Sequence, residues 1–364
     1  MKKISFIIYN LYPGGAERVV SVLANSFVKR GYQVSIIILD NQYIRSYPLL
    51  EGICIFQFKG KLPQKKVMRV PFQVLFTRKI LKKVNPDIII SFMSEVNIIS
   101  ALSNILSNRK LIISERNDPS RDPENKTVRK VRDFVYSKFN ISGFVFQTRD
   151  ARDYFNEKIQ RRSTIIFNPL QPNLPKKYTG QKRKVIVSIG RLASQKNQKL
   201  LLEAFSNLSE KFIEYSLEIF GDGELKNELI EKAEELKIQN KFHLKATTPD
   251  VLWRVHDASL FVLSSDYEGM SNAMIESIAI GIPTIATDCP VGGAREIIKH
   301  GVNGLLTPVG DLKNLTKLME EVLSSSEISE KMSKNGTELK SLLSEDKIFE
   351  EWRNFLNVIL GEIK

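Results

Sequence analysis

Short, almost uninterrupted apolar runs recur along the chain and constrain its fold more than any other feature. In the first half these runs occupy residues 4–9, 34–39, 53–58, 87–92, 110–114, 143–147 and 164–167. Runs without polar alternation are typical of parallel strands that are buried on both faces. Between the first two runs, residues 16–29 carry apolar side chains at helical spacing. This alternation of strand and helix predicts an α/β fold with a doubly wound parallel sheet.

A proline-rich stretch divides the chain. Residues 168–175 contain Pro169, Pro172 and Pro175, which oppose regular structure. Beyond it we predict strands at 185–189, 217–220, 242–244, 260–263, 283–287 and 305–306, and helices at 197–208, 225–236, 249–256, 271–279, 293–299 and 311–324. The expected division is a first domain of residues 1–170, a linker of residues 171–184, a second domain of residues 185–343 and an amphipathic helix at residues 344–364. The two domains are expected to face one another across a cleft.

The positive charge is concentrated in the first half of the chain. Residues 1–170 hold 29 Lys and Arg against 13 Asp and Glu (+16), and residues 171–364 hold 25 against 28 (−3), which together give the net charge of +13. This asymmetry indicates an anionic partner: nucleic acid, anionic lipid or a phosphorylated substrate. The two cysteines and three histidines are scattered, so neither a disulfide nor a zinc site is predicted. No apolar run approaches the ~20 residues that span a bilayer.

Residues 52–86 are unusual because they contain nine basic residues and no acidic one. Apolar residues such as Val67, Phe72 and Leu75 are interleaved with the basic ones. This composition predicts an amphipathic helical region that lies on an anionic membrane surface. The alternative is a helix packed on the sheet with a solvated basic face.

Residues 264–276 follow an apolar strand and lead into a helix, with Ser271 or Asn272 as the N-cap. Gly269 leaves the backbone bare, so the amides near Met270, Ser271 and Asn272 are expected to face an anion at the positive helix end. Glu268 and Glu276 flank this loop, and carboxylates suit hydroxyl groups. Phosphate and hydroxyls together suggest a nucleotide sugar. The alternative is an ordinary capped helix with solvated glutamates.

Three other motifs follow predicted strands. Their residues are Gly14 and Gly15, then Arg191 and Lys196, and then Gly221, Asp222 and Gly223. Glycines between strand and helix let a ligand approach the backbone, and a nearby arginine and lysine can neutralise a pyrophosphate leaving group. Tight turns and surface cations are the alternatives. None of these loops has the three spaced glycines of a dinucleotide-binding fingerprint, which disfavours a dehydrogenase.

Taken together, these motifs resemble glycosyltransferase family 4, whose members are retaining enzymes of the GT-B fold. The resemblance covers nearly the whole chain, and the pair Glu268 and Glu276 is its most specific element. The implied fold is α/β, with two doubly wound Rossmann-like domains and a C-terminal helix that packs back on the first domain. The first domain would bind the acceptor and the second the nucleotide sugar.

The resemblance also implies roles for individual residues. Arg191 and Lys196 would hold the diphosphate and act in catalysis, Glu268 would contact the donor sugar, and Glu276 the ribose. Gly14, Gly15, Gly221, Asp222, Gly223, Gly269, Met270, Ser271 and Asn272 would complete the donor site. Many relatives carry a histidine near the acceptor where this chain has Glu115 and Arg116. Arg116 stays charged and cannot act as a base, so it would bind a phosphate or orient the acceptor; a structural salt bridge is the alternative.

The resemblance therefore implies a retaining glycosyltransferase that needs no metal or cofactor. Its donor would be a UDP-sugar, with UDP-N-acetylhexosamine slightly favoured, and its acceptor a polyprenyl-diphosphate-linked saccharide. The enzyme would be cytoplasmic and peripheral on the inner face of the cytoplasmic membrane, without nucleic acid as a partner. A nucleotide-sugar epimerase or phosphorylase of the same fold is one alternative. A non-catalytic protein that binds nucleic acid or another anionic polymer is the other.

Overall fold

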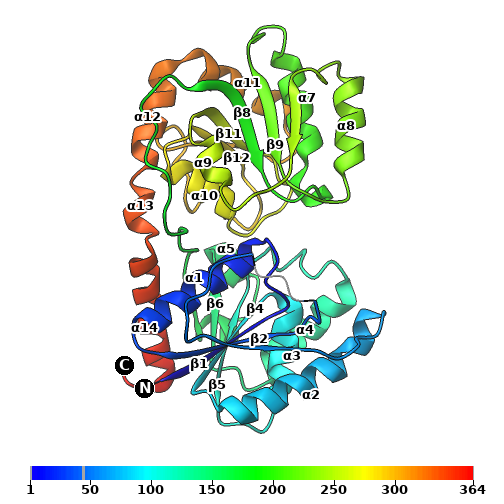
Figure 1. Cartoon of the computed structure of the whole chain (residues 1–364), viewed down its shortest axis with the longest axis vertical. Coiled ribbons are helices and arrows are strands. Elements are labelled where there is room, and N and C mark those ends of the chain that lie inside the picture. The colour runs from blue at the N-terminus through cyan, green and yellow to red at the C-terminus, as the bar shows by residue number, and fades with distance from the viewer. Residues whose placement is uncertain (1, 43–45, 364) are drawn as a thin grey trace. The chain divides into compact units, whose positions relative to one another are not determined.

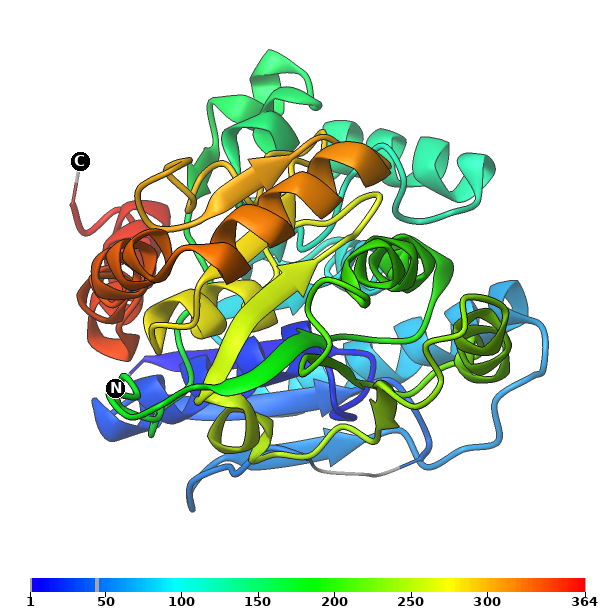
Figure 2. The same cartoon turned by 90° about the horizontal axis from the view of Figure 1, so that it is seen from above.

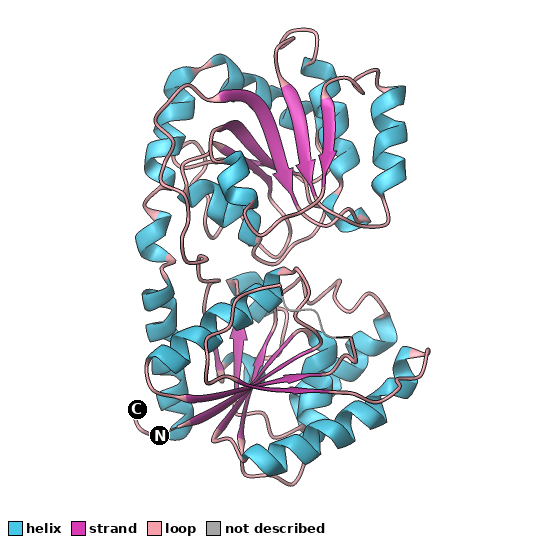
Figure 3. Ribbon diagram, viewed as in Figure 1, coloured by secondary structure: helices cyan, strands magenta, loops and turns pink. Residues whose placement is uncertain are grey.

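The structure, a computed structural model, describes residues 2–42 and 46–363 and divides into two compact units (Figure 1). Unit 1 comprises Met1–Pro169 and Glu345–Lys364, and unit 2 comprises Leu170–Ser344. Each unit is a parallel sheet with helices on both faces (Figure 3). This arrangement confirms the predicted fold class of two Rossmann-like α/β domains.

Unit 1 is built on a seven-stranded parallel sheet in the order β3-β2-β1-β4-β5-β6-β7. Its strands are β1 (Lys3–Ile8), β2 (Gln33–Ile38), β3 (Cys54–Gln57), β4 (Ile88–Phe92), β5 (Lys110–Ser114), β6 (Gly143–Phe146) and β7 (Ser163–Ile165). Every residue of β4 and β6 is buried, as the uninterrupted apolar runs predict. The chain order reverses between β1 and β4, which places the switch point of the sheet there.

The helices of unit 1 cover the two faces of this sheet. They are α1 (Gly15–Lys29), α2 (Lys66–Val84), α3 (Ser94–Ser103), α4 (Lys126–Lys138), α5 (Arg149–Asp153), α6 (Glu157–Gln160) and α14 (Glu345–Leu360). The connections through α2, α3 and α4 run in the opposite direction along the sheet from the one through α1. Right-handed crossovers therefore place α1 on one face and α2, α3 and α4 on the other.

The C-terminal helix α14 packs back on unit 1, as predicted. The ring of Phe349 meets that of Phe27 on α1, with ring centroids 4.9 Å apart. Trp352 is fully buried, and its ring lies 6.2 Å from that of Phe92 at the end of β4. The apolar face of α14 is thus part of the unit 1 core.

Unit 2 is built on a six-stranded parallel sheet in the order β10-β9-β8-β11-β12-β13. Its strands are β8 (Arg183–Ile189), β9 (Ser216–Phe220), β10 (Phe242–Lys245), β11 (Ala258–Leu263), β12 (Thr284–Thr287) and β13 (Leu305–Thr307). Figure 2 follows the order from β8 in green through β11 in yellow to β13 in orange. Its helices are α7 (Gln198–Leu208), α8 (Lys226–Glu235), α9 (Val251–Val255), α10 (Asn272–Ala279), α11 (Leu312–Ser324), α12 (Ser326–Gly336) and α13 (Leu339–Leu342).

The helix predicted at residues 293–299 is wrong, because this segment forms a series of turns. Gly292, just before it, has φ +73, outside the helical region. At the other end, the side chain of Asn303 accepts from the Lys299 N–H (2.8 Å) and donates to the Ile297 carbonyl (3.0 Å). These bonds occupy backbone groups that a continuing helix would use.

Candidate functional site

The predicted donor motifs meet at one edge of unit 2. Because the sheet is parallel, the carboxyl ends of β9, β8 and β11 lie side by side at the same edge. Residues 221–224 follow β9, residues 190–197 follow β8, and residues 264–271 follow β11. The structure thus brings together three loops that are far apart in the sequence. This edge of an open α/β sheet is where ligands bind in such folds.

The loops after β8 and β11 are held together by hydrogen bonds. Asp266 N donates to Gln195 O (2.9 Å), and Gln195 Nε2 donates to Tyr267 O (2.9 Å). Asn197 Nδ2 donates to Asp266 Oδ1 (2.7 Å). Asn197 also adopts a left-handed backbone (φ +42) and caps α7 with its side-chain oxygen. These contacts fix the backbone of Lys196 against the loop that carries Glu268.

Lys196 and Glu268 form an ion pair at this edge. Lys196 Nζ donates to Glu268 Oε2, and Ser265 Oγ donates to the same oxygen (3.1 Å). Their side chains are only 16% and 17% exposed, so water screens the pair less than it would at the surface. Arg191, on the same loop as Lys196, is exposed. The edge therefore offers two cations and a carboxylate to a ligand that carries both phosphate and hydroxyl groups.

The loop that leads into α10 is tightly packed. Ser271 Oγ caps the helix by accepting from Met274 N (3.4 Å). A Cβ at Gly293 would lie 1.6 Å from the carbonyl oxygen of Gly269, so only glycine lets these two backbones approach. Gly269, Met270, Ser271 and Asn272 are buried. The loop has one defined position, which a preorganised anion site requires.

Glu276 lies in the interior of unit 2 and is 1% exposed. Its Oε1 accepts from the backbone N–H of Gln171 (3.3 Å). A ribose hydroxyl would reach the buried carboxylate of Glu276 only if the segment that contains Gln171 moved. The ribose contact of Glu276 therefore stays a prediction.

The glycines of the 221–224 loop allow close packing of two loops. A Cβ at Gly221 would lie 2.0 Å from the carbonyl oxygen of Gly190, and one at Gly223 would lie 2.3 Å from that of Leu192. Leu192 N donates to the carbonyl of Asp222 (2.9 Å), while Asp222 itself is exposed. The glycines thus make room for the backbone of the β8 loop, and the donor contact predicted for Gly221, Asp222 and Gly223 stays a prediction.

Gly14 and Gly15 lie in unit 1, at the start of α1. The hydroxyl of Tyr47 accepts from Gly14 N (3.2 Å) and donates to Gly14 O (3.1 Å). A Cβ at Gly14 would lie 2.1 Å from Glu17 Oε2, so the glycine makes room for this side chain. The predicted diphosphate contact of this loop stays a prediction.

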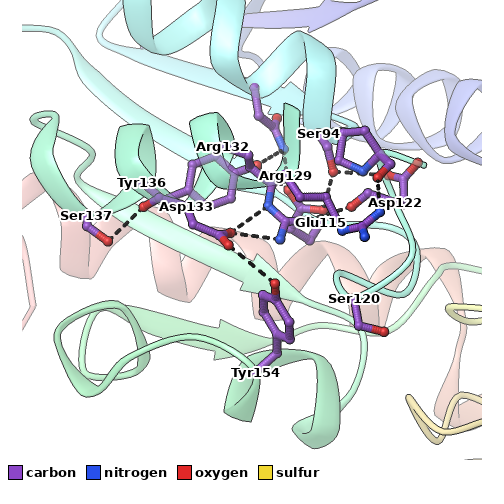
Figure 4. Close-up of polar contacts among 12 residues, drawn as sticks. Ser94, Glu115, Ser120, Asp122, Arg129, Arg132, Asp133, Tyr136, Ser137 and Tyr154 are labelled. Atoms are coloured by element: carbon purple, nitrogen blue, oxygen red, sulfur yellow. Dashed lines mark hydrogen bonds and ion pairs between the residues drawn. The ribbon is translucent and has the colours of Figure 1, made fainter. Parts of the chain in front are cut away.

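Glu115, predicted to contact the acceptor, is the centre of a buried polar network in unit 1 (Figure 4). Its Oε1 accepts from Tyr136 Oη and from Asn97 Nδ2 (3.1 Å), and its Oε2 accepts from Ser94 Oγ (2.9 Å). Burial, the charge of Glu115 and the hydrogen bond to Glu115 raise the pKa of Tyr136. With both oxygens occupied, Glu115 joins β5 to α3 and α4, and a direct acceptor contact would require this network to open.

Arg116 lies beside two aromatic rings that are themselves neighbours. Its guanidinium lies 4.6 Å from the ring centroid of Phe92 and 5.9 Å from that of Trp352, and it donates to Asn168 Oδ1 (2.8 Å). Nε and the second terminal nitrogen are buried and have no hydrogen-bond partner among the described residues. Burial lowers the pKa of Arg116 to about 9, so the group remains charged at neutral pH. An acceptor phosphate would accept hydrogen bonds from these N–H groups once the side chains that bury them move aside.

Asp122, which sequence reasoning did not single out, lies beside this network. Its Oδ2 is 3.0 Å from Ser94 Oγ and shares the single hydroxyl proton of Ser94 with Glu115. Burial, and then the charge of Glu115, raise the pKa of Asp122 to about 6. Below pH ~4 this carboxyl is protonated in the folded and the unfolded chain. As the pH rises to 6, the unfolded chain ionises while the folded chain keeps its proton, so the free energy of unfolding falls.

We therefore expect Asp122→Asn to remove this decrease in the free energy of unfolding. The variant should match the wild type in urea unfolding at pH 3 and exceed it at pH 7.5 by on the order of 2 kcal/mol. The amide oxygen can still accept from Ser94, so the hydrogen bond is kept. A difference in the free energy of unfolding between the variant and the wild type that is equal at both pH values would contradict the raised pKa of Asp122.

Comparisons with known proteins extend over nearly the whole chain. Residues 13–174 match the family model Glycosyltransferase Family 4, and residues 171–339 match Glycosyl transferases group 1. A Campylobacter jejuni protein, "GalNAc-alpha-(1->4)-GalNAc-alpha-(1->3)-diNAcBac-PP-undecaprenol alpha-1,4-N-acetyl-D-galactosaminyltransferase", is 29% identical over 100% of this chain and 99% of its own. An uncharacterized glycosyltransferase of Haemophilus influenzae is 28% identical over 98% and 100%.

Solved structures show the same fold. Sucrose-phosphate synthase of Thermosynechococcus elongatus matches with a TM-score of 0.87 at 14% identity, over 100% of both chains. HepE of Anabaena, in complex with UDP and glucose, matches with a TM-score of 0.83 at 17% identity, over 98% of this chain and 100% of that one. At such identities the likeness concerns the fold alone.

Proposed function

Because the chain belongs to the glycosyltransferases of the GT-B fold, with a family 4 domain followed by a group 1 domain, we propose that it extends a membrane-displayed glycan. The donor is a nucleoside diphosphate sugar held by unit 2, and the acceptor is a hydroxyl of a polyprenyl-diphosphate-linked saccharide. Transfer retains the anomeric configuration. The pairing of Lys196 with Glu268 at the carboxyl edge of the unit 2 sheet carries the proposal.

The donor chemistry follows from this pair. Negative charge develops on the departing diphosphate, and Lys196 and Arg191 supply the positive charge that stabilises it. When Lys196 turns to the diphosphate, Glu268 is left to accept hydroxyl hydrogen bonds from the sugar. UDP is favoured as the nucleotide because the structurally similar HepE has been solved with UDP and glucose. In this scheme Arg191 and Lys196, rather than a metal ion, neutralise the diphosphate leaving group.

The acceptor is inferred from the relatives and from the charge of unit 1. The name of the Campylobacter jejuni relative describes transfer of N-acetylgalactosamine to an undecaprenol-linked saccharide. That match spans the full chain, including the basic first half. An N-acetylhexosamine donor and a lipid-linked acceptor are therefore the first pair to test.

The surface of α2 supports a location at the membrane. Its polar residues Gln73 and Thr77 are 2% and 0% exposed, whereas Phe72 and Leu75 are 50% and 65% exposed. A helix on a soluble surface would place these residues the other way round. Basic side chains accompany the outward apolar ones, as on helices that lie in an anionic membrane interface. In residues 2–42 and 46–363, none of the helices is long and apolar enough to cross a membrane.

We expect Phe72→Ser combined with Leu75→Ser to lower affinity for anionic vesicles at least about tenfold, because two exposed apolar side chains no longer insert. Sedimentation with vesicles of phosphatidylglycerol and phosphatidylcholine measures the change. Ile213→Ser, at an equally exposed apolar position of unit 2, is the matched control and should bind like the wild type. Equal binding of the double variant and the control would exclude α2 as a membrane contact.

A donor screen tests the catalytic proposal. UDP-, GDP- and ADP-sugars are offered with lipid-linked saccharides, and the anomeric proton of the product is read by NMR. An α-linked product from an α-linked donor is the expected result. Donor consumption with an epimerised sugar and no acceptor product would support the epimerase alternative instead.

A further inference from the structure

The outward face of α4 carries a stripe of basic and aromatic side chains. Lys126, Lys130, Phe134 and Lys138 are spaced four residues apart and are all exposed. Residues at this spacing lie above one another on a single helix face. Phe134 is 59% exposed, and Val131 next to it is 46% exposed. The function proposed above does not use this surface.

The single acidic residue of α4 does not offset these charges. Asp133 Oδ1 accepts from Arg132 Nε (2.9 Å) and from a terminal nitrogen of the same guanidinium (2.8 Å). Asp133 Oδ2 accepts from the hydroxyl of Tyr154 (3.3 Å), which Figure 4 shows beside it. Tyr154 is itself 42% exposed. The stripe therefore presents lysines with apolar and aromatic side chains and no unpaired carboxylate.

This stripe lies on the same side of unit 1 as α2. α2 packs against α3, and α3 packs against α4, so the three helices form one layer on one face of the sheet (Figure 1). α1 and α14 pack together on the other face. Side chains that point away from the sheet on α2 and on α4 therefore point to the same side of the unit. Both outward faces are therefore directed toward an anionic surface that approaches unit 1 from that side.

We propose that α4 is a second contact of unit 1 with the anionic membrane. Phe134 and Val131 enter the interface, Tyr154 lies at the depth of the headgroups, and Lys126, Lys130 and Lys138 attract the lipid charge. Two contacts, on helices that are separated by α3, hold unit 1 in one orientation, which a single helix does not. The proposal rests on the membrane location of the proposed function and extends it to a specific second surface.

Phe134→Ser tests this inference without changing the net charge. We expect about tenfold weaker binding to vesicles of phosphatidylglycerol and phosphatidylcholine, and an unchanged Tm because Phe134 is mostly exposed. Val358→Ser is the matched control: Val358 is 47% exposed on α14, on the opposite face of the sheet. The control should bind like the wild type.

Three outcomes would overturn the proposal. The first is that Phe134→Ser binds vesicles like the control. The second is an equal loss of binding to a soluble polyanion such as heparin, which would show that Phe134 supports binding of polyanions in general rather than entering a membrane. In the third, wild type and Phe134→Ser both fail to bind vesicles. Transfer to a lipid-linked saccharide dissolved in detergent is measured in parallel. Activity that persists there keeps the proposed function while the α4 contact fails. Absence of transfer by the wild type to every lipid-linked acceptor offered refutes the function itself.

Discussion

Glu268→Gln is expected to lower kcat/KM for sugar transfer by about a hundredfold, which corresponds to ~3 kcal/mol of transition-state stabilisation. The amide is similar in size, so the loop keeps its shape, and Ser265 Oγ can still donate to the remaining oxygen. The variant loses the negative charge that positions Lys196 and accepts hydroxyl hydrogen bonds. Steady-state transfer and separate binding of the donor by calorimetry measure the two parts of the effect.

A matched control and a double variant make this result specific. Glu321→Gln changes an exposed glutamate on α11 in the same unit and should leave transfer unchanged. Lys196→Ala should weaken transfer at least as much as Glu268→Gln, because the diphosphate loses a cation. If the two residues act as a pair, the double variant loses less than the product of the single losses. Activity of Glu268→Gln equal to that of the control would show that this edge is not the donor site.

Gly293→Ala is expected to abolish most of the transfer activity, by about a hundredfold or more, although it adds a single methyl group. The new Cβ would lie 1.6 Å from the carbonyl oxygen of Gly269 and 3.2 Å from the Cα of Met270, and both atoms belong to the backbone. The loop between Glu268 and α10 must therefore shift, which misplaces groups that need sub-ångström positioning. Overpacking of this kind also costs ~1–3 kcal/mol of stability.

Gly310→Ala serves as the control that separates the loss of transfer activity from the loss of stability. Gly310 has φ +73 and open space around its Cα, so alanine there adds only backbone strain of ~1–2 kcal/mol. This control should lose stability to a similar degree and keep transfer activity. If Gly293→Ala were as active as Gly310→Ala, the packing of the α10 loop would not matter for the site.

The elements and the clustering of the donor motifs were predictable, because strand and helix periodicity together with parallel pairing fix which loop ends meet. Arg191 and Lys196 come from the loop after β8 and Glu268 from the loop after β11, and these two strands are neighbours in the unit 2 sheet. The C-terminal helix was predictable from its wide apolar face, which needs a partner.

Side-chain contacts between distant segments were not predictable. Asn197 is polar and precedes a helix, which suggests a cap, but no local pattern shows that it also bonds Asp266. Gly293 resembles any turn glycine until the Gly269 backbone is placed beside it. Glu115 was assigned to the acceptor because it lies where many relatives carry a histidine. No local pattern shows that it turns inward, where Tyr136 and Asn97 supply hydrogen bonds that water would otherwise provide.

The outward position of Phe72 on α2 likewise depends on which face the sheet covers, and the even mixture of apolar and basic residues in that stretch does not determine it. The buried Gln73 is held by a hydrogen bond to the Leu39 carbonyl (3.2 Å), a contact between segments 34 residues apart. Composition could therefore predict a membrane surface but could not say which side chains form it.

The most direct test of the proposed function is transfer of a labelled sugar from a UDP-sugar to polyprenyl-diphosphate-linked saccharides in anionic vesicles. We expect label to move from the aqueous phase into the lipid extract with release of UDP, and to remain in the aqueous phase with Glu268→Gln. Consumption of the nucleotide sugar by the wild-type protein, with all label left in water-soluble products for every lipid-linked acceptor offered, would contradict the proposal.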